Sequence, residues 1–309
     1  LAPAGGAVWA GTTWLLGISA ATTQNQQVQL PAPATGEPAD LEQAFPWRTA
    51  GIAGSVKIND VAVVATRRLS DVIAVGAALG LRHVAMREQR TAPSASADLV
   101  TLQGTGWRAP SVRLGMLVMP ASLPYEFGAA LTYHRGLTIE GTSTISEGAR
   151  HGAALTMPQA IGAAASLRRV ASRWTLELDG EVAAANQAVQ FWQVNNDEPL
   201  PSRWRNGVRA DVRVSGDVAV IPGMLWLTAG IGWHHGSTAT NAVSPLFQDP
   251  NSTRIAVGAV VAHDGVSIVF GGMLEKAAAR KADHNPAALA ITSERTVVGL
   301  TLEYEFGGL

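Results

Sequence analysis

The sequence predicts an all-β protein that forms an antiparallel transmembrane β-barrel. Apolar residues alternate with small or polar residues along most of the chain, and a period of two is typical of strands. The segments between these strands alternate between long and short. Long loops on one rim and short turns on the other are typical of barrels in bacterial outer membranes.

The composition favours strands over membrane-spanning helices. Charged residues make up 15% of the 309 residues, against about 25% in a typical soluble domain. Small residues such as Gly, Ala, Ser and Thr replace most of the missing charge. The most apolar run, at 218–233, is interrupted by Pro222-Gly223 and is shorter than the roughly 18 residues that a spanning helix needs.

About twelve strands are expected, separated by connections of two kinds. The strands are predicted at 7–20, 50–69, 71–87, 107–119, 124–140, 157–170, 173–184, 203–215, 223–235, 252–262, 265–275 and 294–307. Short turns are predicted at Ser70-Asp71, Ala121 to Leu123, Ala171-Ser172, Ser215 to Pro222 and Asp264-Gly265. Long polar loops are predicted at 21–49, 88–106, 141–156, 185–202, 236–251 and 276–293. Because twelve is even, both ends of this chain are expected at the short-turn rim.

The last predicted strand shows two different faces. One face carries Val298, Leu300, Leu302, Tyr304 and Phe306. The other carries small residues and two carboxylates, Glu303 and Glu305. In a barrel, the first face would meet lipid and the second a hydrated lumen. Tryptophans near predicted strand ends suit the membrane interface: Trp9, Trp14, Trp107, Trp174, Trp204 and Trp233.

Charges on two neighbouring predicted strands favour a wet lumen over a dry core. The acids Glu177, Asp179 and Glu181 share one face of the strand at 173–184. The bases Arg205, Arg209 and Arg213 fall on the same face of the next strand. So many charges would be costly in a dry core, whereas opposite charges across strands stabilise a hydrated wall. Two interpretations stay open: a structural network of ion pairs, or a site in which an arginine orients the carboxylate of a ligand.

Other functional classes find little support in the residues. The chain has no Cys, which excludes disulfides, thiolate catalysis and Cys-based metal sites. The net charge of -1 provides no overall field for nucleic acid. His234 and His235 are neighbours that point to opposite faces of a strand, so they cannot chelate one ion together. We therefore expect no enzyme activity, no metal and no cofactor.

Several segments occur in an order and spacing that match a known family. They include Met157-Pro158-Gln159-Ala160-Ile161-Gly162, Arg173-Trp174-Thr175-Leu176-Glu177-Leu178-Asp179, Leu200-Pro201-Ser202-Arg203-Trp204-Arg205-Asn206-Gly207-Val208-Arg209 and Leu227-Thr228-Ala229-Gly230-Ile231-Gly232-Trp233. Earlier stretches at 67–77 and 104–115 agree with the same order. Over most of its length the chain resembles the long-chain fatty-acid/toluene outer-membrane transporter family.

The resemblance implies a fourteen-stranded barrel that is plugged by an N-terminal hatch. Residues 1–309 are then expected to form a single outer-membrane β-barrel domain, from which the hatch and the first two strands are missing. The strand at 7–20 would match the family's third strand, where a gap forms a lateral exit to the membrane. Gly11 and Gly17 would permit a kink there.

The resemblance also implies a function in the bacterial outer membrane. A hydrophobic or amphiphilic solute, such as a long-chain fatty acid, would diffuse through the barrel and leave laterally or to the periplasm. The partners would be the lipid bilayer and the solute, with no nucleic acid. The lumen residues Glu177, Asp179, Glu181, Arg205, Arg209 and Arg213 would form the ligand site. The alternatives are a structural barrel that anchors an envelope protein complex and, less favoured, a general porin.

Overall fold

The computed structural model contains a single antiparallel sheet, and no residue that it describes is helical. It describes residues 4–29, 53–91, 99–145, 150–157, 159–185, 192–194, 207–236, 251–264, 266–278 and 294–304. Within these ranges, no helix is long and apolar enough to cross a membrane. The all-β, antiparallel fold class is confirmed.

Sixteen strands make up the sheet. They are β1 (Ala4–Ala10), β2 (Trp14–Gln29), β3 (Ala53–Arg68), β4 (Ile73–Thr91), β5 (Leu99–Val118), β6 (Tyr125–His134), β7 (Leu137–Ile145), β8 (Arg150–Met157), β9 (Ala160–Val170), β10 (Trp174–Ala185), β11 (Trp192–Val194), β12 (Val208–Ile221), β13 (Leu225–His235), β14 (Ser252–His263), β15 (Val266–Ala277) and β16 (Glu294–Tyr304). Thirteen strands form the wall in the order β1-β2-β3-β4-β5-β6-β9-β10-β12-β13-β14-β15-β16, and β7, β8 and β11 lie off this path.

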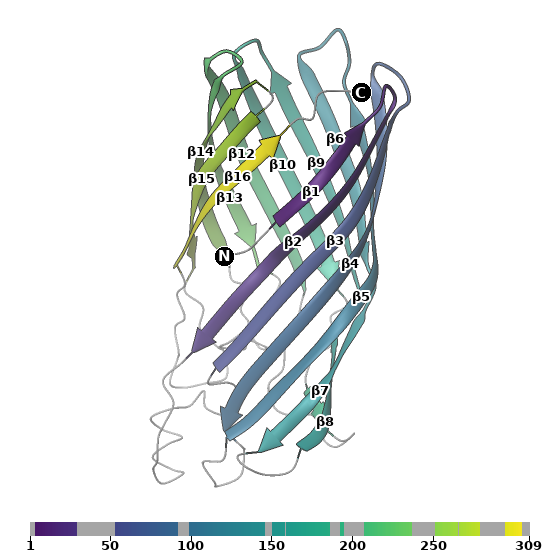
Figure 1. The fold of residues 1–309 in the computed structure, drawn as a ribbon, viewed down its shortest axis with the longest axis vertical. Coiled ribbons are helices and arrows are strands. Elements are labelled where there is room, and N and C mark those ends of the chain that lie inside the picture. Colours follow the sequence, from purple (N-terminus) through teal and green to yellow (C-terminus); the bar gives the residue numbers. More distant parts are fainter. Residues whose placement is uncertain are drawn as a thin grey trace.

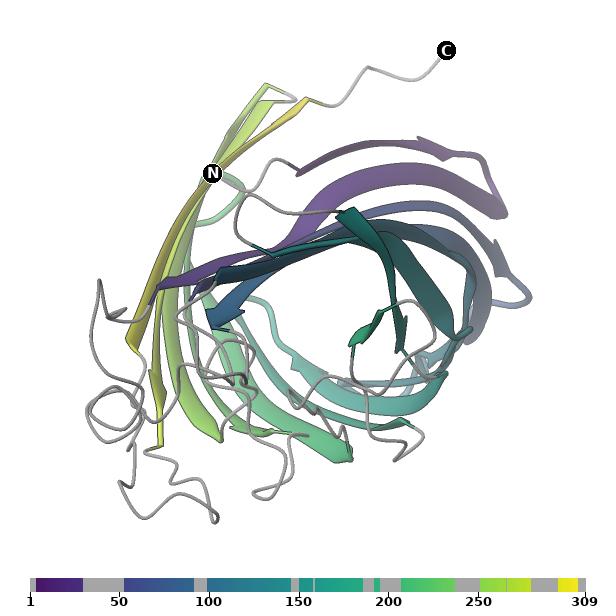
Figure 2. The ribbon, with the colours of Figure 1, turned by 90° about the horizontal axis from the view of Figure 1, so that it is seen from below.

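The wall is a meander rolled around a central opening (Figures 1 and 2). Short connections such as 11–13, 69–72 and 222–224 lie at one rim, the upper one in Figure 1, which we call the short-turn rim. The opposite rim is called the long-loop rim. In the described part of the chain the sheet is not closed, and β1 and β16 are its two ends. They run in the same direction, because an antiparallel path of thirteen strands begins and ends with parallel strands.

The structure changes several predicted boundaries. The predicted strand at 7–20 is a hairpin, β1 and β2, whose turn lies at 11–13. This extra strand means that the described chain begins away from the short-turn rim, where both ends were expected. The turn predicted from Ser215 to Pro222 is wrong over most of its length, since β12 continues to Ile221, with Val218 opposite Trp174 on the outer face. Alternating valines favour a strand at this position.

The predicted loops at 88–106 and 141–156 are also wrong in large part. Strand β4 continues to Thr91, β5 begins at Leu99, and β7 and β8 pair with each other. The strands in these two segments are polar in composition because one of their faces is in water. Their other face carries mainly apolar residues. The predicted positions of Trp204 and Arg205 lie outside the described residues.

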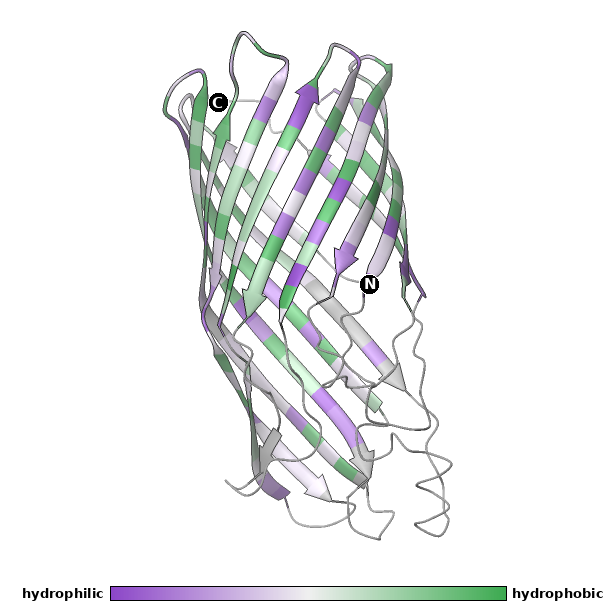
Figure 3. Ribbon diagram, turned by 180° about the vertical axis from the view of Figure 1, so that it is seen from behind, coloured by the Kyte–Doolittle hydropathy of each residue, from purple (hydrophilic) through white to green (hydrophobic). Residues whose placement is uncertain are grey.

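The outer face of the wall carries an apolar row that crosses eight strands. In register order it reads Ile18, Val63, Leu79, Val112, Tyr133, Ile161, Ala184 and Val208. Its large side chains are exposed, for example Leu79 at 58% and Ile161 at 59%. Figure 3 shows hydrophobic and hydrophilic residues alternating along the same strands. Such an apolar surface suits lipid rather than water.

The two faces exchange character where β3, β4 and β5 continue towards the long-loop rim. There the inner face forms a buried apolar cluster of Val56, Val84, Met86, Val100, Leu102, Leu137, Ile139, Ala153 and Leu155. The outer face carries polar residues such as Lys57, Thr105 and Glu140. We call this part, 53–60, 82–91 and 99–107 with β7 and β8, the extension. The lipid-facing remainder of the wall is called the apolar band.

Glycine permits the close packing of β5 on β7 in the extension. A Cβ atom at Gly104 would lie 2.7 Å from the carbonyl oxygen of Glu140 and 2.9 Å from Cγ2 of Ile139. Gly141 lies opposite Gly104 in the register, and a Cβ atom there would collide with the Gln103 carbonyl. Larger residues would force the two strands apart. The inner face can therefore curve tightly around the apolar cluster.

Candidate functional site

Two neighbouring rows of side chains cross the inner face of the wall, and both change character along their length. The first lumen row reads Thr66, Gly76, Gly115, Ala130, Ala164, Glu181, Asp211, His234 and Ser252. The second lumen row reads Ala74, Leu117, Gly128, Ser166, Asp179, Arg213, Gly232, Arg254 and Glu275. Residues on β4, β5, β6 and β9 are small or apolar, whereas those from β10 onwards are mainly charged. The two lumen rows therefore have a smooth half, on β4, β5, β6 and β9, and a charged half, from β10 onwards.

A cavity of about 360 Å³ lies where the two halves meet. Its smooth side includes Gly76, Gly128 and Ala164, and its charged side includes Asp179 and Arg213. Small side chains leave this space open, because the row residues on β4, β5, β6 and β9 project few atoms into the lumen. A ligand with an apolar body and an anionic end would find both kinds of surface here.

The ladder of charges predicted on β10 and β12 is present as far as the structure describes it. Arg209 Nη2 donates to Glu181 Oε1 at 2.9 Å. Arg213 Nη2 lies 3.9 Å from Asp179 Oδ2, and the Arg213 side chain is 61% exposed. Arg213 is therefore held only weakly by its acidic neighbour and faces the cavity. Arg205 lies outside the described residues, so its place in the ladder stays a prediction.

Glu177, the third predicted acid, belongs to the same face of β10. It lies opposite Arg168 of β9 and Ser215 of β12 in the register. Arg168 Nη1 in turn lies 3.4 Å from Glu126 Oε2 of β6. An ion pair therefore also lies on β6 and β9, beside the small residues of the two lumen rows. A structural role and a ligand-binding role for the ladder both stay predictions.

A second network, which the sequence analysis did not single out, joins β12 to β15. Asp211 Oδ1 lies 2.9 Å from His234 Nδ1 and 3.3 Å from Arg254 Nη1. Arg254 Nε donates to Glu275 Oε1 at 2.9 Å, and the Ser252 hydroxyl donates to the same oxygen at 2.6 Å. Alternation along the strand would have been enough to predict that Arg254 points inward, because its neighbour Ile255 points outward. Its partners come from separate strands, so only the register could bring them together.

The two glycines predicted at the lateral opening lie in different settings. Gly11 is in the turn between β1 and β2, where its N–H donates to the Trp14 carbonyl oxygen at 2.7 Å. Gly17 lies inside β2, between Val8 of β1 and Val64 of β3. They do not share a single kinked strand, because the predicted strand is a hairpin. Their role in a lateral exit stays a prediction.

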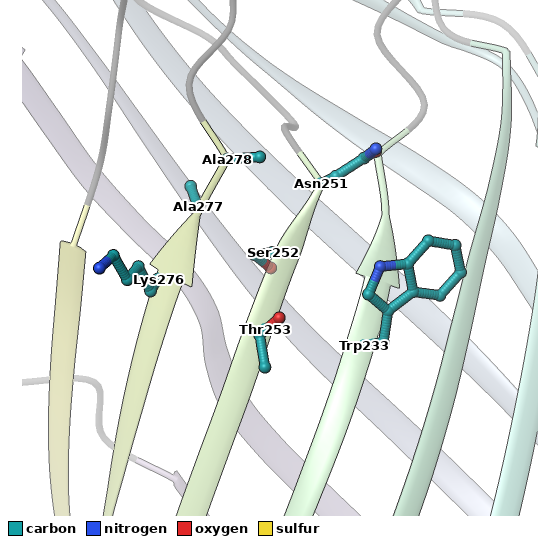
Figure 4. Close-up of a pocket in the computed structure, with 7 residues that line it drawn as sticks. All are labelled: Trp233, Asn251, Ser252, Thr253, Lys276, Ala277 and Ala278. Atoms are coloured by element: carbon teal, nitrogen blue, oxygen red, sulfur yellow. The ribbon is translucent and has the colours of Figure 1, made fainter.

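A smaller depression of about 280 Å³ lies near the long-loop rim, at the ends of β13, β14 and β15 (Figure 4). Trp233, Thr253 and Lys276 lie side by side in the register and share the outer face. The Trp233 ring stacks on His235, with centroids 5.7 Å apart. This depression is therefore separate from the lumen cavity. Within the described ranges, no group of three or more His, Asp or Glu side chains could hold a metal ion.

An apolar outer face and a partly charged inner face on a rolled antiparallel sheet define an outer-membrane β-barrel with a solvated lumen. This class belongs in the bacterial outer membrane. Solved structures of transport proteins share the fold. A FadL homologue from Pseudomonas aeruginosa superimposes with a TM-score of 0.76 at 11% identity, over 97% of this chain and 77% of that chain.

Two structures of a toluene transporter are also similar. TodX from Pseudomonas putida has a TM-score of 0.70 at 12% identity, over 99% of this chain and 82% of that chain. A TodX mutant described as a monoaromatic hydrocarbon channel has a TM-score of 0.71 at 12% identity, over 99% of this chain and 83% of that chain. No protein-family model and no curated protein matches the sequence. The antiparallel outer-membrane barrel that the family resemblance implies is confirmed, whereas the hatch and the first two strands stay predictions.

Proposed function

We propose that this barrel carries hydrophobic or amphiphilic solutes, with long-chain fatty acids as the favoured class, across the bacterial outer membrane. The solute enters at the long-loop rim, diffuses down the lumen and leaves laterally or to the periplasm. The observation that carries the proposal is the cavity between the smooth half and the charged half of the lumen. The proposal also draws on the names of the similar structures, a FadL homologue and a toluene transporter.

The charged half favours an acid over an uncharged hydrocarbon. A guanidinium group can bind a carboxylate through two parallel hydrogen bonds. Arg213 is the best placed cation, because its side chain is 61% exposed and its contact with Asp179 is long at 3.9 Å. The small residues of β4 to β9 would then lie along the apolar tail. Arg209 is less available, since Glu181 already occupies it at 2.9 Å.

A structural barrel that anchors an envelope protein complex is the alternative. Such a protein needs a stable wall but has no use for an open cavity beside an exposed arginine. The cavity therefore favours transport. The two roles differ in a direct measurement, since only a transporter is expected to bind solute in its lumen.

The test compares binding of a fluorescent fatty acid with binding of an uncharged fluorescent hydrocarbon. Arg213→Gln is expected to weaken fatty-acid binding about tenfold, as loss of a charge-assisted contact does, and to leave hydrocarbon binding unchanged. Ala130→Phe, which adds a ring on the smooth side, is expected to weaken both. Arg113→Gln is the matched control, because Arg113 also faces the lumen, where its Nε donates to the Thr132 hydroxyl at 3.1 Å.

Each outcome decides between the roles. Equal fatty-acid affinity in the original protein and in Arg213→Gln would show that the acid binds elsewhere. An equal loss in Arg113→Gln would assign the effect to the general charge of the lumen. If neither probe binds the original protein, transport of hydrophobic solutes is wrong and the structural barrel is favoured.

A further inference from the structure

Two arginines on the outer face lie close to the short-turn rim and are flanked by aromatic rings. Arg169 Cζ of β9 lies 5.1 Å from the ring centroid of Trp174 and 5.8 Å from that of Tyr125. Arg67 Cζ of β3 lies 5.1 Å from the ring centroid of Trp14. The register places Arg169 opposite Tyr125 and Arg67 opposite Trp14. Each cation therefore shares the outer face with its rings.

The neighbours Arg168 and Arg169 show how different the two faces are. Arg168 points into the lumen and forms an ion pair with Glu126 at 3.4 Å. The outward neighbours of Arg169 on β6 and β10 are aromatic or apolar, and Leu176 lies directly opposite it. In the described part of the chain, neither Arg169 nor Arg67 forms an ion pair with a carboxylate. Both cations thus lack an anion from the described residues.

A lipid-facing cation without an anion is costly unless it reaches the headgroup region. Phosphate is the anion that a phospholipid offers at this depth, and arginine binds it with strong bidentate hydrogen bonds. Interfacial Trp and Tyr rings lie at the same level, and they hold a guanidinium group over their faces. In outer-membrane barrels the short turns face the periplasm. The leaflet in question is therefore the periplasmic one.

We propose that Arg169, held against Trp174 and Tyr125, binds the phosphate of a phospholipid in the periplasmic leaflet. Arg67 on Trp14 forms a second site of the same kind. The two lie four strand positions apart along the wall, roughly 19 Å at the usual strand spacing, so they bind separate lipids. An anionic headgroup is preferred to a zwitterionic one, because none of the described neighbours of Arg169 on the outer face of β6 and β10 is acidic and could receive an ammonium group. The sites do not depend on what the lumen transports.

Native mass spectrometry of the folded chain, titrated with phosphatidylglycerol or phosphatidylcholine, tests the proposal. The original protein is expected to retain two phosphatidylglycerol molecules more firmly than any phosphatidylcholine. Arg169→Gln and Arg67→Gln should each remove one of them, and the double variant should bind its first phosphatidylglycerol about tenfold more weakly. Arg169→Lys, which keeps the charge but not the planar group, should fall between. The control Arg113→Gln changes a lumen arginine and should retain both lipids.

Heat-dependent gel migration identifies the variants that are folded. If the double variant does not fold, each single variant carries the test on its own. The proposal is overturned if the folded arginine variants retain phosphatidylglycerol as the original protein does. It is also overturned if Arg113→Gln loses as much lipid as they do. Equal retention of phosphatidylcholine by the original protein would overturn the preference for anionic headgroups.

Discussion

The apolar band and the extension are built from the same strands, yet their faces are reversed. On β5, Leu114 of the apolar band points outward, whereas Leu102 of the extension points inward and is fully buried. Gln103 of the extension points outward. In both regions apolar and polar residues alternate with a period of two. The alternation therefore identifies a strand, but it does not show which face of the strand meets lipid, water or a buried core. Whether the apolar side chains point out or in depends on whether lipid or water lies outside.

The boundary between the two regions contains a β-bulge. Between Gly80 and Arg82 of β4, the register on β5 passes from Ser111 to Arg108, so β5 contains one extra residue. Pro110 lies in this bulge, a position where a missing N–H is tolerated. The extra residue exchanges the faces of even-numbered and odd-numbered residues of β5. At the same level, Arg82 Nε donates to Asp60 Oδ1 at 2.6 Å, which joins β4 to β3.

The largest effect is expected from truncating the buried cluster of the extension. Leu102→Ala should cost about 2 to 5 kcal/mol of local stability, because it leaves a cavity among fully buried neighbours such as Ile139. We expect proteases to cleave the extension faster while the apolar band keeps its heat-dependent gel migration. Limited proteolysis with peptide mapping measures this. Simultaneous loss of both regions would show that the extension and the apolar band unfold as one unit.

A charge on the outer face should distinguish the two regions of β5. Leu114→Arg is expected to cost about 2 to 4 kcal/mol of folding free energy in lipid vesicles, since the side chain faces the apolar band. Gln103→Arg should change it by no more than about 0.5 kcal/mol, since this outer face is in water. Denaturant titration of the folded barrel in vesicles compares the two. Similar costs would place the membrane boundary elsewhere on β5.

The smallest effect concerns the tight packing of β5 on β7. Gly104→Ala should destabilise the extension by about 1 to 3 kcal/mol, because the new methyl group meets the Glu140 carbonyl oxygen. Gly180→Ala is the control, since nothing lies within 4 Å of its added Cβ atom. It should be neutral or stabilise by up to about 1 kcal/mol. Hydrogen exchange at 99–107 measures the difference, and equal protection in the two variants would contradict the close-packing argument.

Much of the wall was predictable, because each strand faces lipid on one side and water on the other and its sequence therefore alternates between apolar and polar residues. The strands near 160–170 and 174–185 were predicted within about three residues, and so were the inward directions of Glu177 and Arg213. The parts of the extension at 88–106 and 141–156 were predicted as loops, because their outer face is as polar as a loop. The apolar–polar alternation along β7 and β8 was the sequence signal for these strands. In β5 the same alternation is interrupted at Pro110, which concealed it. Ion pairs across strands, such as that of Arg254 with Glu275, depend on register.

The sequence by itself determined the fold class, the alternation of long and short connections, and the two faces of most wall strands. These features follow from residue types at fixed spacing, because the backbone of a strand points successive side chains to opposite faces. Only the tertiary structure decided that β1 and β2 form a hairpin, that the extension buries its apolar face inward, and that two rows of lumen residues meet at a cavity. Each of these depends on which residues of distant strands lie opposite one another. A shift of the pairing register by one residue moves every side chain of a strand from the inner face to the outer face. The sequence of one strand alone does not determine its register.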